Sequence, residues 1–124
     1  MTDRELLELA AKAAGLKINQ AFQAQRDAVM APAKASLWID DGSTAWNPLT
    51  DDGHALRLAM TLELGVVCKR ESDPYEKNRS VVTDPYRVNQ LRIVEAHKGN
   101  PEAATRRAIV RAAAEIGQAM QEKS

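Results

Sequence analysis

The sequence predicts an α+β protein in which helices pack on an antiparallel sheet. Amphipathic helical patterns alternate with short apolar runs, and turn-forming residues separate those runs. Short strands joined by turns favour an antiparallel sheet, and helices bury their apolar faces against such a sheet. We expect a layered sandwich of the α/β/α type with three main helices. The helices are expected near 2–14, 50–64 and 100–121, and the sheet is expected to include 36–46 and 90–96.

The size and charge of the chain limit the classes of protein to which it can belong. A length of 124 residues suits one hydrophobic core, so residues 1–124 are expected to form a single domain. The 17 basic and 17 acidic residues give zero net charge, which makes nucleic acid and anionic lipid poor partners. One cysteine, Cys68, allows no internal disulfide and fits a reducing cytoplasm. The polar start and the lack of an apolar run of about 18 residues predict neither a signal peptide nor a membrane span.

Boundary signals are clearest for the first and last helices. Thr2 and Glu5 have the spacing of a capping box, and Gly15 is a typical left-handed stop. Asn100 suits the N-cap of the last helix, and Pro101 suits its first helical position.

The middle helix is expected to begin after Thr50, as its N-cap, and to end at Gly65. Asp51 and Asp52 then fall in the first turn, where negative charge suits the helix dipole.

The stretch 16–36 permits three interpretations. Alternation over 16–19 suggests a short strand, and 21–30 has the composition of a helix that Pro32 would end. The many polar side chains also suit an insertion that stays mobile. The sequence alone leaves all three open.

Several short segments predict strands. Two apolar runs, 36–39 and 44–46, flank a turn signal that contains Gly42, and this pattern predicts a β-hairpin. The run 66–68 predicts a buried strand. Further strands are expected at 79–83 and at 90–96, the latter half-exposed because its polarity alternates.

Residues 46–59 carry a resemblance to a known family. They run Trp-Asn-Pro-Leu-Thr-Asp-Asp-Gly-His-Ala-Leu-Arg-Leu-Ala, and this segment resembles small proteins of tailed bacteriophages and prophages that contain a phage ABA-sandwich domain. The opening segment 3–15 and the last-helix segment 104–117 are similar to the same group. The resemblance implies a sheet layered with helices and a location in the cytoplasm of a bacterial host cell. It implies no activity, and so it supplies no catalytic residues.

Two acidic pairs, Asp40-Asp41 and Asp51-Asp52, are candidates for a divalent cation site because carboxylate oxygens bind such ions. A turn explains the first pair and a helix N-terminus explains the second, and the spacing matches no metal-binding loop. We therefore expect no metal site and no cofactor.

Nucleophilic chemistry would need Cys68 beside His54 or His97, the only histidines in the chain. Cys68 follows two valines in a predicted buried strand, where a thiol is inert packing. The chain is therefore expected not to be an enzyme.

Four aromatic side chains are candidate anchors for a protein partner, because large aromatics often dominate interfaces. The two tryptophans have a second interpretation, which is that they fill the core. The candidates are Trp38, Trp46, Tyr75 and Tyr86.

Arg106, Arg107 and Arg111 form a candidate nucleic-acid patch on the last helix. Glu102, Glu115 and Glu122 interrupt this face, and such mixed charge favours a solvated helix surface over a nucleic-acid patch.

These observations favour a small phage or prophage accessory protein that acts by stoichiometric binding, for example to a host or phage protein during host takeover or defence. The alternatives are a nucleic-acid-associated protein that uses the basic second half and, third, an unrecognised enzyme. Self-association into a homo-oligomer is left open.

Overall fold

The computed structural model describes residues 1–29, 36–39, 44–75, 77–86 and 91–122. Within these residues the chain forms four helices, a two-stranded sheet and a three-stranded sheet, so the predicted α+β class is confirmed. The elements are α1 (Asp3–Ala14), α2 (Gln20–Val29), β1 (Leu37–Ile39), β2 (Thr44–Trp46), α3 (Asp52–Leu62), β3 (Gly65–Lys69), β4 (Arg79–Asp84), β5 (Leu91–Ala96) and α4 (Pro101–Glu122).

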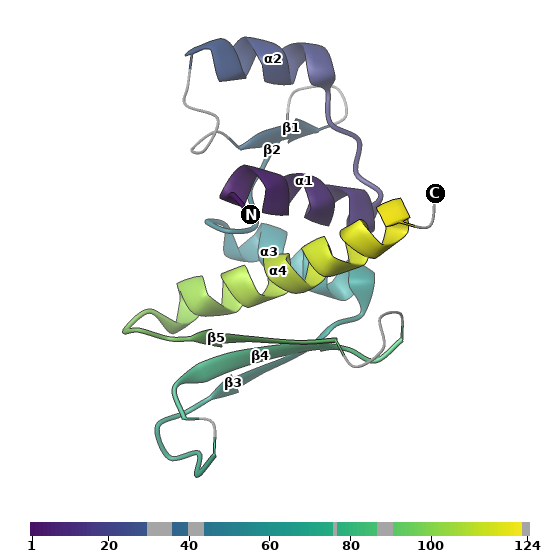
Figure 1. Cartoon of the computed structure of the whole chain (residues 1–124). Coiled ribbons are helices and arrows are strands. Elements are labelled where there is room, and N and C mark those ends of the chain that lie inside the picture. Colours follow the sequence, from purple (N-terminus) through teal and green to yellow (C-terminus); the bar gives the residue numbers. More distant parts are fainter. Residues whose placement is uncertain (30–35, 40–43, 76, 87–90, 123–124) are drawn as a thin grey trace.

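The long helix α4 lies at the centre of the fold (Figure 1). One side of α4 packs on the antiparallel sheet β3-β4-β5, and its other side packs on α1 and α3. The hairpin β1-β2 and α2 stack beyond α1. In the described part of the chain, no helix covers the outer face of the three-stranded sheet. The expected α/β/α layering and the expected three main helices are not confirmed.

The hairpin forms a sheet of its own. Leu37 pairs with Trp46 and Ile39 with Thr44, whereas β5 pairs with β4. The prediction of one sheet that includes both 36–46 and 90–96 is therefore wrong. The physical reason is that Leu37, Ile39 and Trp46 bury their side chains in the helical core, so the hairpin caps the helices and does not extend the sheet.

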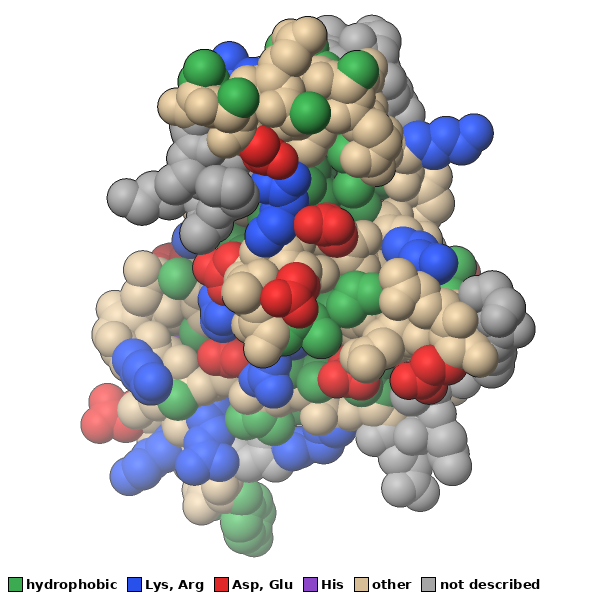
Figure 2. Space-filling model, turned by 45° about the horizontal axis from the view of Figure 1, so that its top comes forward, with side chains coloured by type: hydrophobic (Ala, Val, Ile, Leu, Met, Phe, Trp, Pro, Cys, Tyr) green, Lys and Arg blue, Asp and Glu red, His purple; other side chains and the backbone are tan. Residues whose placement is uncertain are grey.

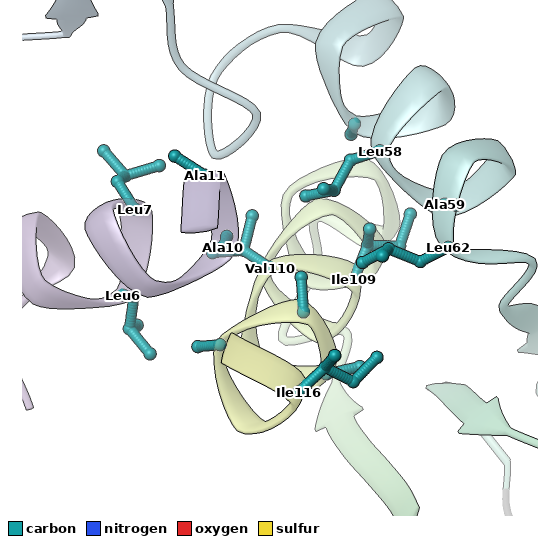
Figure 3. Close-up of a cluster of buried hydrophobic side chains, with 14 of the residues drawn as sticks. Leu6, Leu7, Ala10, Ala11, Leu58, Ala59, Leu62, Ile109, Val110 and Ile116 are labelled. Carbon is teal, nitrogen blue, oxygen red and sulfur yellow. The ribbon is translucent and has the colours of Figure 1, made fainter. Parts of the chain in front are cut away.

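Small and branched side chains build the core between the helices (Figure 3). Alanines on α1 and α4 allow these two helices to pack closely, and leucines of α3 close the third side. The labelled core residues are Leu6, Leu7, Ala10, Ala11, Leu58, Ala59, Leu62, Ile109, Val110 and Ile116.

The ends of α1 and α4 follow the sequence signals. The Glu5 backbone N–H donates to Thr2 Oγ1 at 3.1 Å, and Gly15 has a left-handed φ of 75°. The Glu5 carboxylate accepts from the Thr2 hydroxyl and not from the Thr2 backbone. Asn100 caps α4, because its side-chain oxygen accepts from the Ala103 N–H at 3.0 Å.

Both predicted boundaries of the middle helix are wrong by one or two residues. The N-cap of α3 is Asp51 and not Thr50, since the Asp51 side chain accepts from the His54 N–H at 2.8 Å. The C-cap is Glu63, which adopts a left-handed φ of 56°. Gly65 instead begins β3, where an added Cβ would lie 2.8 Å from Thr83 Oγ1. A larger residue here would require the Thr83 side chain to move, and the glycine does not form the helix stop.

The stretch 16–36 combines two of its three interpretations. Helix α2 confirms the interpretation of 21–30 as a helix. The Asn19 side chain accepts from the Phe22 N–H at the start of this helix. The expected strand is reduced to a single bridge between Ile18 and Ile39. Residues 30–35 lie outside the described part of the chain.

Candidate functional site

A pocket of about 390 Å³ opens between α3, α4 and β3. Ala55 and Ala59 lie one turn apart on α3 and are small enough to leave this space beside Ile109 of α4. The pocket is lined by Asp52, Ala55, Leu56, Ala59, Val66, Cys68, Pro101, Glu102, Thr105, Arg106 and Ile109. A mostly apolar pocket with a few polar groups is the usual form of a binding site in proteins.

Large apolar side chains are exposed at the mouth of this pocket. Leu56 of α3 is 60% exposed and Val66 of β3 is 38% exposed, and both line the pocket. Met60, one turn beyond Leu56 on α3, is 66% exposed. Exposed apolar side chains that adjoin one another are typical of an interaction surface.

The strand that borders the pocket is an edge strand. Among the described strands, β3 pairs with β4 alone, and Val66, Val67 and Cys68 are all exposed. The strand prediction for 66–68 is therefore confirmed, but its predicted burial is wrong. An apolar run does not show whether a strand lies at the edge or in the centre of a sheet, because both kinds of strand satisfy the same local pattern. Proteins usually protect such edges with charge, proline or a bulge, and β3 carries no charge before Lys69.

A chain of polar side chains lies behind the pocket. Cys68 Sγ is 3.3 Å from Thr105 Oγ1, which in turn lies 2.6 Å from Ser80 Oγ. Ser80 is completely buried and lies 3.0 Å from His97 Nε2. The network therefore connects the thiol at the pocket wall to His97 at the end of the sheet.

The proton positions in this network follow from its acceptors. The Pro101 carbonyl can only accept, so Thr105 donates its hydroxyl proton to it at 2.7 Å. Ser80 then donates to Thr105 and also lies 3.8 Å from Cys68 Sγ, and Ser80 Oγ accepts from His97 in the tautomer that carries its proton on Nε2. In this arrangement His97 is a donor and does not remove a proton from Ser80. The arrangement favours a structural role for these residues over nucleophile activation.

Ser80 and Thr105 were not identified from the sequence. The alternation of side chains along a strand could have identified Ser80 as buried, because Ser80 and Val82 are two positions apart and share the face that α4 covers. A serine at a buried strand position needs a hydrogen-bond partner, and Thr105 supplies it.

The acidic pair Asp51-Asp52 belongs to the start of α3. The His54 backbone N–H holds the pKa of the Asp51 carboxyl below its usual value. His54 Nδ1 accepts from the Asn47 N–H at 3.1 Å, which gives this histidine a role in the same turn. Asp40 and Asp41 lie outside the described residues.

Each arginine of the candidate nucleic-acid patch pairs with a carboxylate. Arg106 Nη1 lies 2.6 Å from Asp52 Oδ1, and Arg106 Nε also donates to the Leu49 carbonyl. The remaining pairs are Arg107 with Asp3 at 2.9 Å and Arg111 with Glu95 at 2.5 Å. These contacts join α4 to the neighbouring elements, and they leave the patch close to neutral.

The two tryptophans point to opposite faces of the hairpin. Trp46 is 5% exposed and belongs to the core. Trp38 faces α2, where the Phe22 ring stands 5.0 Å away in an edge-to-face arrangement and the Arg26 guanidinium lies 5.0 Å above the ring. This aromatic contact attaches α2 to the hairpin.

The two candidate tyrosines are strongly exposed and lie far apart. Tyr75, in the loop between β3 and β4, is 90% exposed, and Tyr86, after β4, is 71% exposed. The two loops leave opposite ends of the three-stranded sheet (Figure 1). The tyrosines therefore do not belong to one site with each other or with the tryptophans.

Metal-ligand clusters and membrane-spanning helices are both absent from the described residues. These residues contain no group of three or more His, Cys, Asp or Glu side chains placed to hold a metal ion. No helix among them is both long and apolar enough to cross a membrane.

Comparisons of the chain with family models, with curated proteins and with solved structures found no match.

Proposed function

We propose that this chain is a small phage or prophage accessory protein that binds a host or phage protein stoichiometrically in the cytoplasm of a bacterial host cell. The observation that carries the proposal is the apolar edge strand β3, which runs beside the pocket between α3 and α4. The phage ABA-sandwich resemblance of 46–59 supports the phage origin.

The proposed partner presents an extended segment that adds to β3. The free edge of β3 offers backbone N–H and C=O groups to such a segment, and a pocket beside an edge can take one of its side chains. Ala55, Ala59 and Ile109 favour a large apolar side chain in this position. Asp52 is paired with Arg106, whereas Glu102 is exposed on the pocket wall, so a basic side chain next to the apolar one would complement the charge of Glu102.

Binding without turnover is supported by the network behind the pocket. Ser80 connects Cys68 to His97, both directly at 3.8 Å from Cys68 Sγ and through Thr105, and Thr105 donates its proton to the Pro101 carbonyl. The side chains of Cys68, Ser80 and Thr105 thus hold β3, β4 and α4 together.

A library of displayed peptides tests this proposal even though the partner is unidentified. We expect selection against the purified chain to enrich extended peptides with a large apolar residue, and we expect the enriched peptides to bind in a 1:1 ratio. Leu56→Asp should weaken binding by at least about tenfold, because loss of an interface anchor costs about 2 kcal/mol. Titration calorimetry measures both the ratio and the affinity.

Val29→Asp is the matched control. Val29 is 76% exposed at the end of α2, so the same charge is introduced far from the pocket. Unchanged binding by this variant, together with weak binding by Leu56→Asp, is the expected pair of results. Selected peptides that bind Leu56→Asp and the unmodified chain equally well would refute the proposed site.

A further inference from the structure

The outer face of the three-stranded sheet is a surface that the proposed function does not use. Residues that alternate with the α4-facing positions point outward, and the helices that the structure describes lie on the other face (Figure 1). A row of three valines crosses the middle of this outer face, because Val67 pairs with Val81 and Val81 with Val94. Val67 is 50% exposed, whereas Val81 is buried and Val94 is half-buried, so the apolar surface of this row is open mainly at Val67.

Basic side chains flank the valine row. Lys69 pairs with Arg79 on one side of the row, and Arg92 pairs with Thr83 on the other. The nine outward positions of the three strands include these three cations and no carboxylate. They are Gly65, Val67, Lys69, Arg79, Val81, Thr83, Arg92, Val94 and Ala96.

More cations adjoin one end of this face. The Asn78 N–H donates to the Arg70 carbonyl at 3.2 Å, and the His97 N–H donates to the Asn78 carbonyl at 2.9 Å. These bonds bring three segments together, and exposed Arg70, Lys77 and Lys98 lie within them. Figure 2, in which the outer face of the sheet is turned away from the viewer, shows several Lys and Arg side chains at the lower edge of the molecule.

An exposed aromatic ring accompanies this charge. Tyr75 lies in the loop that joins β3 to β4 at the same end, and the Asp73 side chain fixes its backbone by accepting the Tyr75 N–H at 2.9 Å. Asp73 also lies 3.7 Å from Lys69 Nζ. The sequence of this loop also contains three acidic residues, Glu71, Asp73 and Glu76. The excess of positive charge is therefore limited to the outer face of the sheet and its edge.

We infer that the outer face of the sheet binds single-stranded nucleic acid. Arg70 and Arg79, both exposed, meet backbone phosphates, and a nucleobase stacks on Tyr75 or packs beside Val67. An open sheet face with positive charge and an exposed aromatic suits an unpaired strand, because splayed bases reach a flat surface that a duplex does not. The arginines of α4 contribute little, since each already pairs with a carboxylate.

Fluorescence anisotropy with labelled oligothymidylate and oligouridylate of about twelve nucleotides tests the inference. The double variant Arg70→Gln with Arg79→Gln should weaken binding at least about fivefold at low salt. It should also reduce the slope of log affinity against log salt by about 1.4, the value for two lost phosphate contacts to a single strand. Tyr75→Ala should weaken binding by about fivefold or more with the slope unchanged, because a stacked base carries no charge.

Lys12→Gln with Lys17→Gln is the matched control, since it removes the same charge from exposed positions at the other end of the fold. This control should bind as the unmodified chain does. Equal weakening by both double variants, tighter binding of a duplex than of single strands, or equal competition by polyglutamate would overturn the inference. Equal affinity for the two oligonucleotides indicates recognition of phosphate and base, and a preference for one sugar indicates a contact to the 2′ position; both support it.

Discussion

Gly117 lies where α4 passes closest to α1. An added Cβ at this position would clash with the Leu9 carbonyl oxygen and would lie 2.8 Å from the Leu9 carbonyl carbon. Both neighbours are backbone atoms of a helix, so neither can move without a shift of α1. The close approach allows Ala10 and Ala113, both fully buried, to bring the two helices together.

We therefore predict that Gly117→Ala destabilises the protein even though alanine favours helices. Overpacking of this kind typically costs about 1–3 kcal/mol, more than the gain of about 1 kcal/mol in helix propensity. Chemical denaturation gives the free energy of unfolding. Gln118→Ala, at an exposed position of the same helix, should leave that free energy nearly unchanged. A Gly117→Ala protein as stable as the unmodified chain would show that α1 and α4 are further apart than these distances require.

The roles of single residues were also the hardest feature to predict from the sequence. The sequence identified Gly15 and Asn100 as helix-capping residues, because capping depends on local geometry. Ser80 and Thr105 are 25 positions apart, and only the packing of α4 on β4 brings their hydroxyls within 2.6 Å. Such a network depends on tertiary structure, so no local pattern contains it.

Polar and aromatic contacts attach helix α2 to the described rest of the fold. Arg4 of α1 forms two hydrogen bonds with Asp27, at 2.7 and 3.1 Å. The buried Gln23 side chain accepts from the Trp38 N–H at 2.8 Å and donates to Asp27. Because little apolar area fixes α2, these contacts determine whether it stays in place.

The attachment of α2 should depend on pH. The hydrogen bonds from Arg4 hold the pKa of the Asp27 carboxyl below its usual value, although partial burial opposes this. A lowered pKa means that the ion pair stabilises the docked helix at pH values above about 4 and that this contribution is lost as the pH falls through the lowered value. We expect α2 to loosen in acid before the core unfolds.

Fluorescence of Trp38 reports this step, since Phe22 and Arg26 cover its ring only while α2 is docked. Asp27→Asn should give the loosened signal at neutral pH and should remove the acid transition. Glu8→Gln is a suitable control, because Glu8 contacts Arg4 from a more exposed position. If Asp27→Asn left the transition in place, another group would have to be responsible for it.

The positions of the strands were predicted more successfully than their pairing within sheets. The strands near 66–68, 79–83 and 90–96 were recognised from alternation and apolar runs, and the structure contains them as β3, β4 and β5. Which strands share a sheet depends on side-chain burial across the whole fold, so the separation of the hairpin from this sheet was not evident. The exposure of β3 was missed for the same reason.

In the molecule as a whole, β3 belongs to both proposed surfaces. Val66 and Cys68 point to the pocket side, whereas Val67 and Lys69 point to the open face of the sheet. A partner segment added to the free edge would extend the sheet and so widen the open face. The two proposals therefore predict that protein and nucleic acid can bind at the same time, on opposite faces of one sheet.

Hydrogen–deuterium exchange of the complex with a selected peptide tests the proposed edge binding most directly. Backbone amides at the free edge of β3 exchange readily in the unbound chain and become hydrogen-bonded when a strand is added. We predict slower exchange over Gly65–Lys69, together with protection around Leu56 and Met60 on α3. Protection confined to α2, to the hairpin or to the loops, with exchange over Gly65–Lys69 unchanged, would contradict the proposal that this edge receives the partner.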